Sequence, residues 1–323
     1  MEQLGITDLR PGDVLLYRGN ALLSRLIQHF DGSPASHVAI YLGGGQVGEA
    51  VAEGVVPRDW ETSFHGAEWV RVYRLVSDPA DMGPVLGVAS AILGRGERYG
   101  YEQLLMLAVL CTTRKIQITP VLRRLLRTLL DAATRLLVEL TQGGREPMIC
   151  SEFVYRCYDQ AKPSVQDEYS IDIGGMLPLP GGARGAGPAR GVSEESLAAL
   201  FASPASSLWI PPSAEAAQRG VDEAPGMEEV EALAEAYLQE VEAPRRAAAD
   251  EEEVSLGELR AATDRFVISV YRSRSGAQAG ARAAVEDERS AAYDYLFQAT
   301  PDFVTPADFW TTESLSLVGE VDH

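Results

Sequence analysis

The amino-acid sequence predicts an α+β fold, in which a strand-rich N-terminal half is followed by a mostly helical chain. Three observations support this prediction: strand-like stretches joined by three glycines between residues 36 and 51, an apolar stripe at helical spacing over 119–140, and a shift to Ala and Glu from about residue 213. A chain of 323 residues with 46% hydrophobic residues can bury a sizeable core, and its length indicates one or two domains.

Composition excludes several classes of function. The formal net charge is −19 and the pI is about 4.6, which argue against a nucleic-acid partner. Three cysteines are too few for a disulfide framework and fit a reducing compartment. Residues 1–16 lack the pattern of a signal peptide, and the longest strongly apolar stretch, 104–111, is far too short to span a membrane. We therefore expect a cytoplasmic protein.

The first elements are predicted to be short strands around one helix. A glycine turn over 43–45 joins two strands into a hairpin, and Asn20 is a candidate cap for a helix over 21–30. The expected strands, in order along the chain, cover residues 14–17, 36–42, 46–51, 55–60 and 69–75.

The register of the hairpin decides whether a histidine meets a carboxylate. With the three glycines as the loop, Leu42 faces Gln46 and Ala39 faces Glu49. His37 and Glu49 then project from the same face as diagonal neighbours, roughly 7–8 Å apart at the backbone. A slip of one residue would put them on opposite faces. The alternative for Glu49 is a solvated residue at the edge of the sheet.

Residues 84–140 are predicted to form a helical insert, with helices over 84–94, 101–111 and 119–140. The stretch 114–135 holds six basic residues and one acidic residue, Asp131. It could lie on an anionic membrane surface or bind an acidic partner. Alternatively, these charges form the solvated face of a helix that packs on the core, and this interpretation is favoured because such helices are ordinary in globular proteins.

The segment that follows Ile149 predicts a helix that starts at Cys150 or Ser151, with an apolar side of Phe153, Val154, Cys157 and Tyr158. A cysteine at a helix N-terminus faces unpaired backbone N–H groups and the positive end of the helix dipole, and both favour the thiolate. The alternative is a buried, inert cysteine, since free cysteine is among the most buried residue types. We expect that role for Cys111 and Cys157.

The C-terminal part is predicted to be an appendage. A Gly/Pro-rich stretch over 174–191, a short helix near Leu197 and a strand over 206–212 close the first domain, 1–212. Residues 213–323 then read as an acidic, Ala/Glu-rich and partly disordered helical region. Its helices are expected over 227–241, 255–271 and about 283–297. Its apolar residues indicate packing on the first domain or on a protein partner.

His37, Glu49 and Cys150 together have the residue types of a cysteine catalytic triad: a thiolate, an imidazole that handles its proton, and a polar group that orients the imidazole. In papain-type enzymes the cysteine comes first, whereas here the histidine does, as a circular permutation would produce. With the motifs PGDVLLYRG, SHVAIYLGGGQVGEAV and ICSEFVYRCY, the sequence resembles the permuted papain-like thiol enzymes of the NlpC-type superfamily. That family includes the bacterial permuted amidase-like proteins and the lecithin retinol acyltransferase branch.

The resemblance covers residues 1–212 at most and implies a circularly permuted papain-like fold, with an antiparallel sheet packed on the nucleophile's helix. It also implies Cys150 as nucleophile, His37 as base and Glu49 as orienting residue. The expected substrate is a small-molecule, lipid or peptide acyl group, cleaved or transferred through a thioester. Neither a cofactor nor a metal is expected. Asp13 and Tyr17 are candidates for lining the cleft.

Two other functions are compatible with the same residues. The chain could be a catalytically inactive binding module that recruits a partner through its C-terminal region. It could also hold zinc through His37, Glu49 and Cys150, although zinc sites usually contain closely spaced pairs of ligands.

Overall fold

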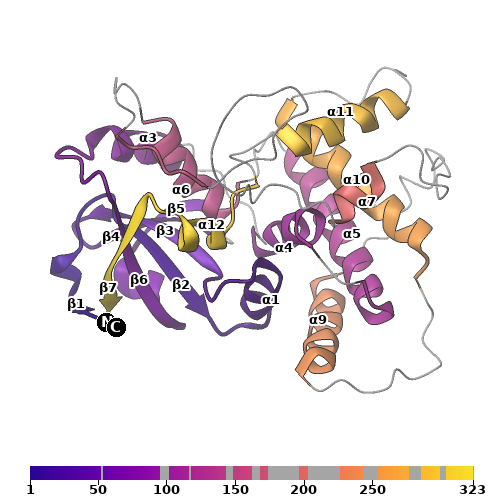
Figure 1. Ribbon diagram of the computed structural model, residues 1–323, viewed down its shortest axis with the longest axis horizontal. Helices are drawn as coiled ribbons and strands as arrows, with labels where there is room; N and C mark the ends of the chain where they lie inside the picture. The colour runs from indigo at the N-terminus through magenta and orange to yellow at the C-terminus, as the bar shows by residue number, and fades with distance from the viewer. Residues whose placement is uncertain are drawn as a thin grey trace. The chain divides into compact units, whose positions relative to one another are not determined.

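The computed structural model describes residues 1–51, 54–94, 102–115, 118–142, 148–161, 168–173, 196–202, 226–242, 254–275, 285–298 and 303–322. The chain forms two compact units (Figure 1). The first contains Met1–Met106, Met148–Arg190 and Thr300–His323, and the second contains Leu107–Pro147 and Gly191–Ala299.

The first unit is built on a seven-stranded sheet with the order β1-β7-β6-β2-β3-β4-β5. All neighbouring strands are antiparallel except β1 and β7, which are parallel. The chain is therefore a mixed α/β protein with a mostly antiparallel sheet. The strands are β1 (Gln3–Leu4), β2 (Val14–Gly19), β3 (His37–Gly43), β4 (Gln46–Val51), β5 (Gly54–Asp59), β6 (Ala67–Leu75) and β7 (Leu315–Val321).

Short helices surround this sheet. Helix α6 packs against β3 and β4, and α3 packs against α6. The helices of this unit are the 3-10 helix η1 (Ile6–Asp8), α1 (Leu22–Asp31), α2 (Trp60–Phe64), α3 (Gly83–Leu93), α6 (Cys150–Asp159) and α12 (Pro306–Thr311). Helix α4 (Glu102–Thr113) crosses the boundary between the two units.

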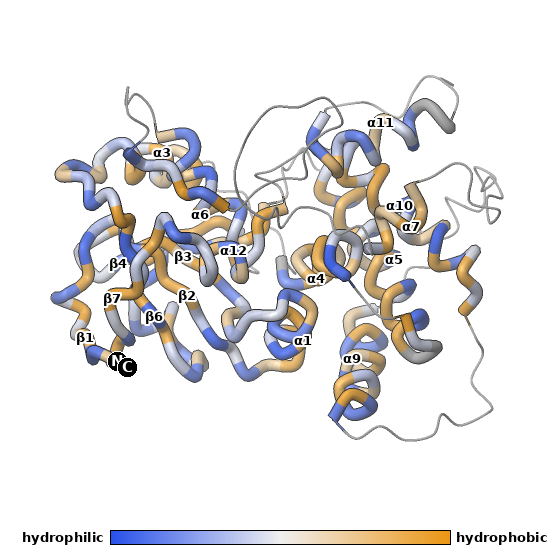
Figure 2. The backbone as a smooth tube through the Cα atoms, in the orientation of Figure 1, coloured by the Kyte–Doolittle hydropathy of each residue, from blue (hydrophilic) through white to orange (hydrophobic). Residues whose placement is uncertain are grey.

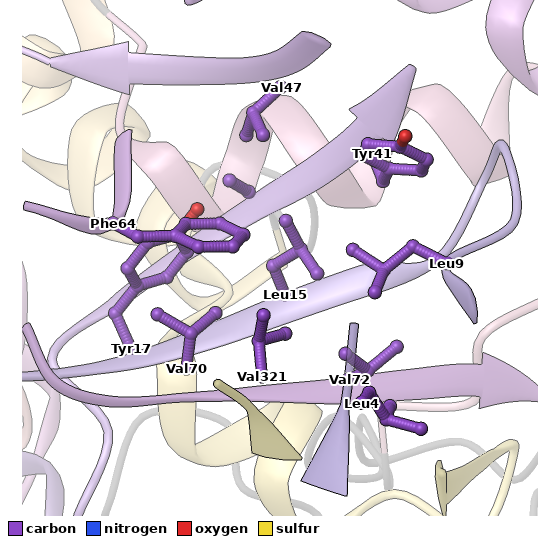
Figure 3. Packing of buried hydrophobic residues seen from close by; sticks show 11 residues of the cluster. Leu4, Leu9, Leu15, Tyr17, Tyr41, Val47, Phe64, Val70, Val72 and Val321 are labelled. Carbon is purple, nitrogen blue, oxygen red and sulfur yellow. The ribbon is translucent and has the colours of Figure 1, made fainter. Parts of the chain in front are cut away.

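One cluster of the core gathers apolar side chains from β2, β3, β4, β6 and β7, together with α2 and residues near the N-terminus (Figure 3). Leu15 and Val72 are fully buried within it, and Phe64 reaches it from α2. Tyr17 belongs to the same cluster and pairs with His37 across β2 and β3. The core therefore extends up to the candidate histidine.

The C-terminal residues return to the first unit, which differs from the predicted division at residue 212. Strand β7 lies between β6 and β1, and Trp310 of α12 packs on Trp69 at 5.8 Å between ring centroids. Leu315 and Val321 of this strand are buried, whereas Ser316 and Leu317 are exposed. The Ala- and Glu-rich residues before this segment had predicted that it belongs to the helical appendage.

The predicted helix over 21–30 is present, but its predicted cap is wrong. Helix α1 begins at Leu22 with Ala21 at the N-cap position, and no side chain caps it. Asn20 lies one position too early for that role. The predicted loop over 174–191 and the strand over 206–212 lie outside the described residues.

The described elements of the second unit are all helices, and hydrophobic stretches along α5 and α10 are visible in Figure 2. Helix α10 packs against α5, α7 and α11, and α9 packs against α5. The predicted helices over 119–140, 227–241, 255–271 and 283–297 are present with small shifts. The observed bounds are α5 (Pro120–Gln142), α7 (Leu197–Ala202), α9 (Met227–Glu242), α10 (Leu256–Ser275) and α11 (Val285–Gln298).

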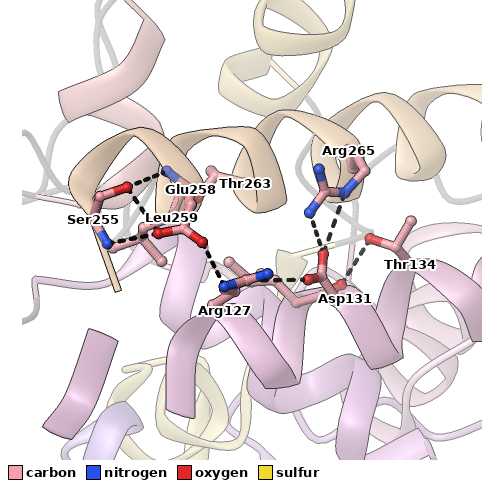
Figure 4. Close-up of polar contacts among 9 residues, drawn as sticks. Arg127, Asp131, Thr134, Ser255, Glu258, Leu259, Thr263 and Arg265 are labelled. Carbon is pink, nitrogen blue, oxygen red and sulfur yellow. Dashed lines mark hydrogen bonds and ion pairs between the residues drawn. The ribbon is translucent and has the colours of Figure 1, made fainter. Parts of the chain in front are cut away.

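Charged and polar groups of the same unit contact the polar face of α5 (Figure 4). Arg127 contacts Glu258 at 2.7 Å, and Asp131 accepts a hydrogen bond from Arg265 at 2.6 Å. Arg123 donates to the backbone carbonyl of Val254. The basic stretch 114–135 therefore contributes to packing between α5 and α10. Within the described residues, no helix has the length and apolar character needed to cross a bilayer.

Candidate active site

The hairpin of β3 and β4 has the predicted register along most of its length. Gly43, Gly44 and Gly45 have positive φ angles of 95°, 61° and 78°, which glycine adopts without strain. The cross-strand pairs are Ile40 with Gly48 and Tyr41 with Val47, and an irregularity beside the turn pairs Gly43 with Gln46.

This register brings His37 and Glu49 to the same face of the sheet. The imidazole Nε2 of His37 lies 3.1 Å from Oε2 of Glu49. Glu49 is only 2% exposed, so the alternative of a solvated edge residue is wrong. A buried carboxylate needs hydrogen-bond donors, and His37 is one of them.

Cys150 is the first residue of α6, and Ile149 is the N-cap. The backbone N–H groups in this first turn have no acceptor within the helix. Ser151 donates a hydrogen bond of 2.5 Å to the carbonyl of Val304, so the start of α6 is fixed by the C-terminal segment. Cys150 is 3% exposed, and its side chain interacts with His37 and raises the pKa of that imidazole.

His37 thus contacts both other members of the predicted triad. Burial, the largest influence, would lower the pKa of His37, but Cys150 and Glu49 together raise that pKa well above 6.5. Their charges and hydrogen bonds favour the imidazolium.

Two further side chains hold the carboxylate of Glu49. Ser63 of α2 donates to Oε2 at 3.3 Å, and Nη1 of Arg58 in β5 lies 3.6 Å from Oε1. The hydroxyl of Ser63 is also 2.7 Å from the hydroxyl of Tyr17. Neither Ser63 nor Arg58 was predicted from the sequence, since no motif marks them. The antiparallel pairing of β4 with β5, which places Arg58 opposite Val47, could have pointed to Arg58.

The other candidates from the sequence have different surroundings. Asp13 is buried and accepts two hydrogen bonds of 2.7 Å from Arg74. The ring of Tyr17 lies edge-on to His37 at 5.1 Å between centroids. His65 is the exposed C-cap residue of α2.

Cys111 and Cys157 are buried free thiols. Burial raises the pKa of both thiols well above the usual thiol value. Neither has the imidazole contact that Cys150 has, and a raised pKa disfavours the reactive thiolate.

No model of a known protein family matches this chain. A comparison with curated proteins gave no match either. The arrangement of His37, Glu49 and Cys150 therefore carries the functional argument.

One cavity of about 690 Å³ lies elsewhere in the first unit. Its lining includes Arg10, Asp13, Arg74 and Leu86. Asp13 precedes β2, whereas Tyr17 near the other end of that strand pairs with His37. The cavity is thus offset from the triad along β2. Among the described residues, no group of three or more His, Cys, Asp or Glu side chains is arranged to hold a metal ion.

Proposed function

We propose that this chain is a cysteine-dependent acyl-transfer enzyme of the permuted papain-like type, acting on an amide or ester. The observation that carries the proposal is that Nε2 of His37 lies 3.1 Å from Glu49, while Cys150, the first residue of α6, interacts with the same imidazole and raises its pKa. These three groups come from β3, β4 and the first turn of α6, and their types and connections fit a cysteine triad.

In the first half of the reaction, the sulfur of Cys150 attacks the acyl carbonyl carbon and forms a tetrahedral intermediate. The carbonyl oxygen takes up the negative charge, and the backbone N–H of Cys150 is a suitable donor to it. As the bond between the carbonyl carbon and the leaving group breaks, the imidazolium of His37 gives its proton to the departing amine or alkoxide. A thioester on Cys150 remains.

In the second half, His37 takes a proton from water, or from an acceptor amine or hydroxyl, as its oxygen or nitrogen attacks the thioester. The carbon–sulfur bond breaks, the acid or transferred product leaves, and the sulfur again faces the imidazolium. Glu49 keeps the ring oriented through both halves and stabilises its positive charge.

The chain order also supports the permuted form of the fold. The histidine strand β3 precedes the cysteine helix α6, and α6 packs on β3 and β4 of a mostly antiparallel sheet. Membrane contact through residues 114–135 has less support, because contact with lipid would compete with the pairing of Arg127 and Glu258. We therefore base the proposal on amide or ester chemistry alone.

A single-turnover experiment with activated acyl esters and acyl amides tests the proposal. After acid quenching, the peptide that contains Cys150 should carry the mass of the acyl group, and Cys150→Ala should abolish this adduct. A Cys157→Ala variant is the matched control and should acylate normally. Absence of an adduct with every acyl donor, in a folded protein, would favour the inactive binding module instead.

A further inference from the structure

Ser63 contacts Glu49, and Tyr17 contacts Ser63. Neither residue belongs to the predicted triad. Glu49 presents Oε2 to two groups, Nε2 of His37 at 3.1 Å and Oγ of Ser63 at 3.3 Å. Among the residues that the structure describes, none forms a hydrogen bond with its other oxygen, Oε1, which lies 3.6 Å from Arg58. The carboxylate can therefore turn toward the imidazolium of His37 or toward the guanidinium of Arg58. The neutral hydroxyl of Ser63 holds it on the side of His37.

The direction of the hydrogen bonds that link Tyr17, Ser63 and Glu49 follows from the chemistry of these three groups. An ionised carboxylate only accepts, so Ser63 must give its single hydroxyl proton to Glu49. The contact of 2.7 Å between Ser63 and Tyr17 must then be donated by Tyr17. Burial and the charge of Glu49 raise the pKa of Tyr17, which keeps the phenol protonated and able to donate.

Helix α2 holds Ser63 in place from two sides. Asp59 caps the helix by accepting hydrogen bonds of 2.8 Å from the backbone N–H and the hydroxyl of Thr62. Phe64 is buried against the ring of Tyr17, with 5.9 Å between centroids. The same Tyr17 ring lies edge-on to His37. Tyr17 thus contacts Ser63 through its hydroxyl and His37 through its ring, which are the two ends of the series Ser63, Glu49, His37.

We propose that Tyr17 and Ser63 are positioning residues that direct hydrogen bonds onto Glu49 and keep this carboxylate hydrogen-bonded to His37 rather than to Arg58. The inference rests on the proposed function, because it concerns the orientation of the triad. Without the hydroxyl of Ser63, Glu49 turns toward Arg58 and the imidazolium of His37 loses part of its support. The imidazolium then stabilises the sulfur of Cys150 less well, and alkylation of Cys150 slows.

The test is the rate at which iodoacetamide alkylates Cys150 in the full chain, followed by mass spectrometry over a range of pH. Ser63→Ala should slow alkylation at neutral pH by about tenfold, which corresponds to an upward shift of about one pH unit in the midpoint of the profile. Ser63→Thr keeps the hydroxyl and should restore the wild-type profile. Tyr17→Phe should act in the same direction, by about threefold.

Two variants separate positioning from damage to the fold. Thr62→Ala weakens the cap of α2 without touching Glu49, and it should leave the profile unchanged. Arg58→Met removes the competing cation and should reverse most of the Ser63→Ala defect in the double variant. A Ser63→Ala profile that equals that of the wild type, or that equals the Thr62→Ala profile, overturns the inference.

The His37→Ala and Ser63→Ala variants distinguish a failure of the proposed function from a failure of this inference. If His37→Ala leaves the alkylation profile of Cys150 unchanged, the triad itself is wrong and the positioning role is wrong with it. If His37→Ala shifts the profile and Ser63→Ala does not, the triad stands and only the role of Ser63 and Tyr17 is refuted.

Discussion

The two ends of α6 carry the same residue type in different settings. Cys150 and Cys157 are both buried, at 3% and 0% exposure. Cys150 begins the helix and interacts with the imidazole of His37, whereas Cys157 lies two turns later, where burial raises its pKa. Burial alone thus makes a cysteine inert, and the imidazole partner together with the free N–H groups of the first turn sets Cys150 apart.

The largest expected difference between the two cysteines of α6 is the effect of their removal on turnover. Cys150→Ala should lower the hydrolysis of a responsive acyl ester by about a thousandfold or more, because the nucleophile is lost. Cys157→Ala should leave kcat/KM within a few-fold, although it opens a small cavity in the core. Comparable losses in the two variants, measured by steady-state kinetics on folded protein, would contradict the assignment of roles along α6.

A smaller effect is expected when the orienting carboxylate is neutralised. Glu49→Gln removes a charge-assisted hydrogen bond to His37, which contributes about 1.5–3 kcal/mol and corresponds to about 10- to 150-fold in kcat/KM. His37 must be protonated to release the leaving group, so kcat/KM falls as pH rises through its pKa. That pKa is raised above 6.5 by Cys150 and Glu49, against the effect of burial.

Glu49→Gln should therefore move the alkaline limb of the profile of kcat/KM against pH to lower pH. Amide substrates are preferred for this measurement because a poor leaving group needs the proton most. An alkaline limb at the same pH in both proteins would show that Glu49 does not support the imidazolium.

The start of α6 should also depend on the C-terminal segment. Ser151→Ala leaves the buried carbonyl of Val304 without the hydroxyl that donates to it, at a cost of about 1–3 kcal/mol. Chemical denaturation of the first unit should record this loss. An unchanged free energy of unfolding would mean that the link between Ser151 and Val304 does not stabilise the fold.

The smallest effect is expected at the far end of the helix. The hydroxyl of Tyr158 donates to the carbonyl of Gly12, and Tyr158→Phe removes that bond. The expected loss of stability is about 1 kcal/mol, with no change in the alkylation rate of Cys150. A large fall in that rate would instead show that the two ends of α6 are coupled.

The sequence predicted the parts of the site that have local patterns. The glycine turn determined the register that brings His37 beside Glu49, and the apolar spacing after Ile149 located the start of α6. The predicted long helices of the second unit are present because their periodicity extends over several turns.

Other parts depend on contacts between distant segments and could not be predicted. Ser63 lies in a helix of five residues, too short for a helical period to appear. Strand β7 follows an Ala- and Glu-rich stretch, and its place between β1 and β6 depends on residues that are distant in the sequence. The sequence shows that Arg127 is basic, but it does not show that Glu258 is its partner in the fold.

The most direct test of the central claim compares alkylation of Cys150 and Cys157 across pH, in the wild type and in His37→Ala. Iodoacetamide reports the rate at each cysteine, and the ultraviolet absorbance of thiolate gives a second readout that does not require access for a reagent. In the wild type, Cys150 should react at neutral pH much faster than Cys157. In His37→Ala, this advantage should disappear until the pH approaches about 8.5, the range of an ordinary thiol. A Cys150 that reacts no faster than Cys157, or that reacts identically with and without His37, would contradict the account.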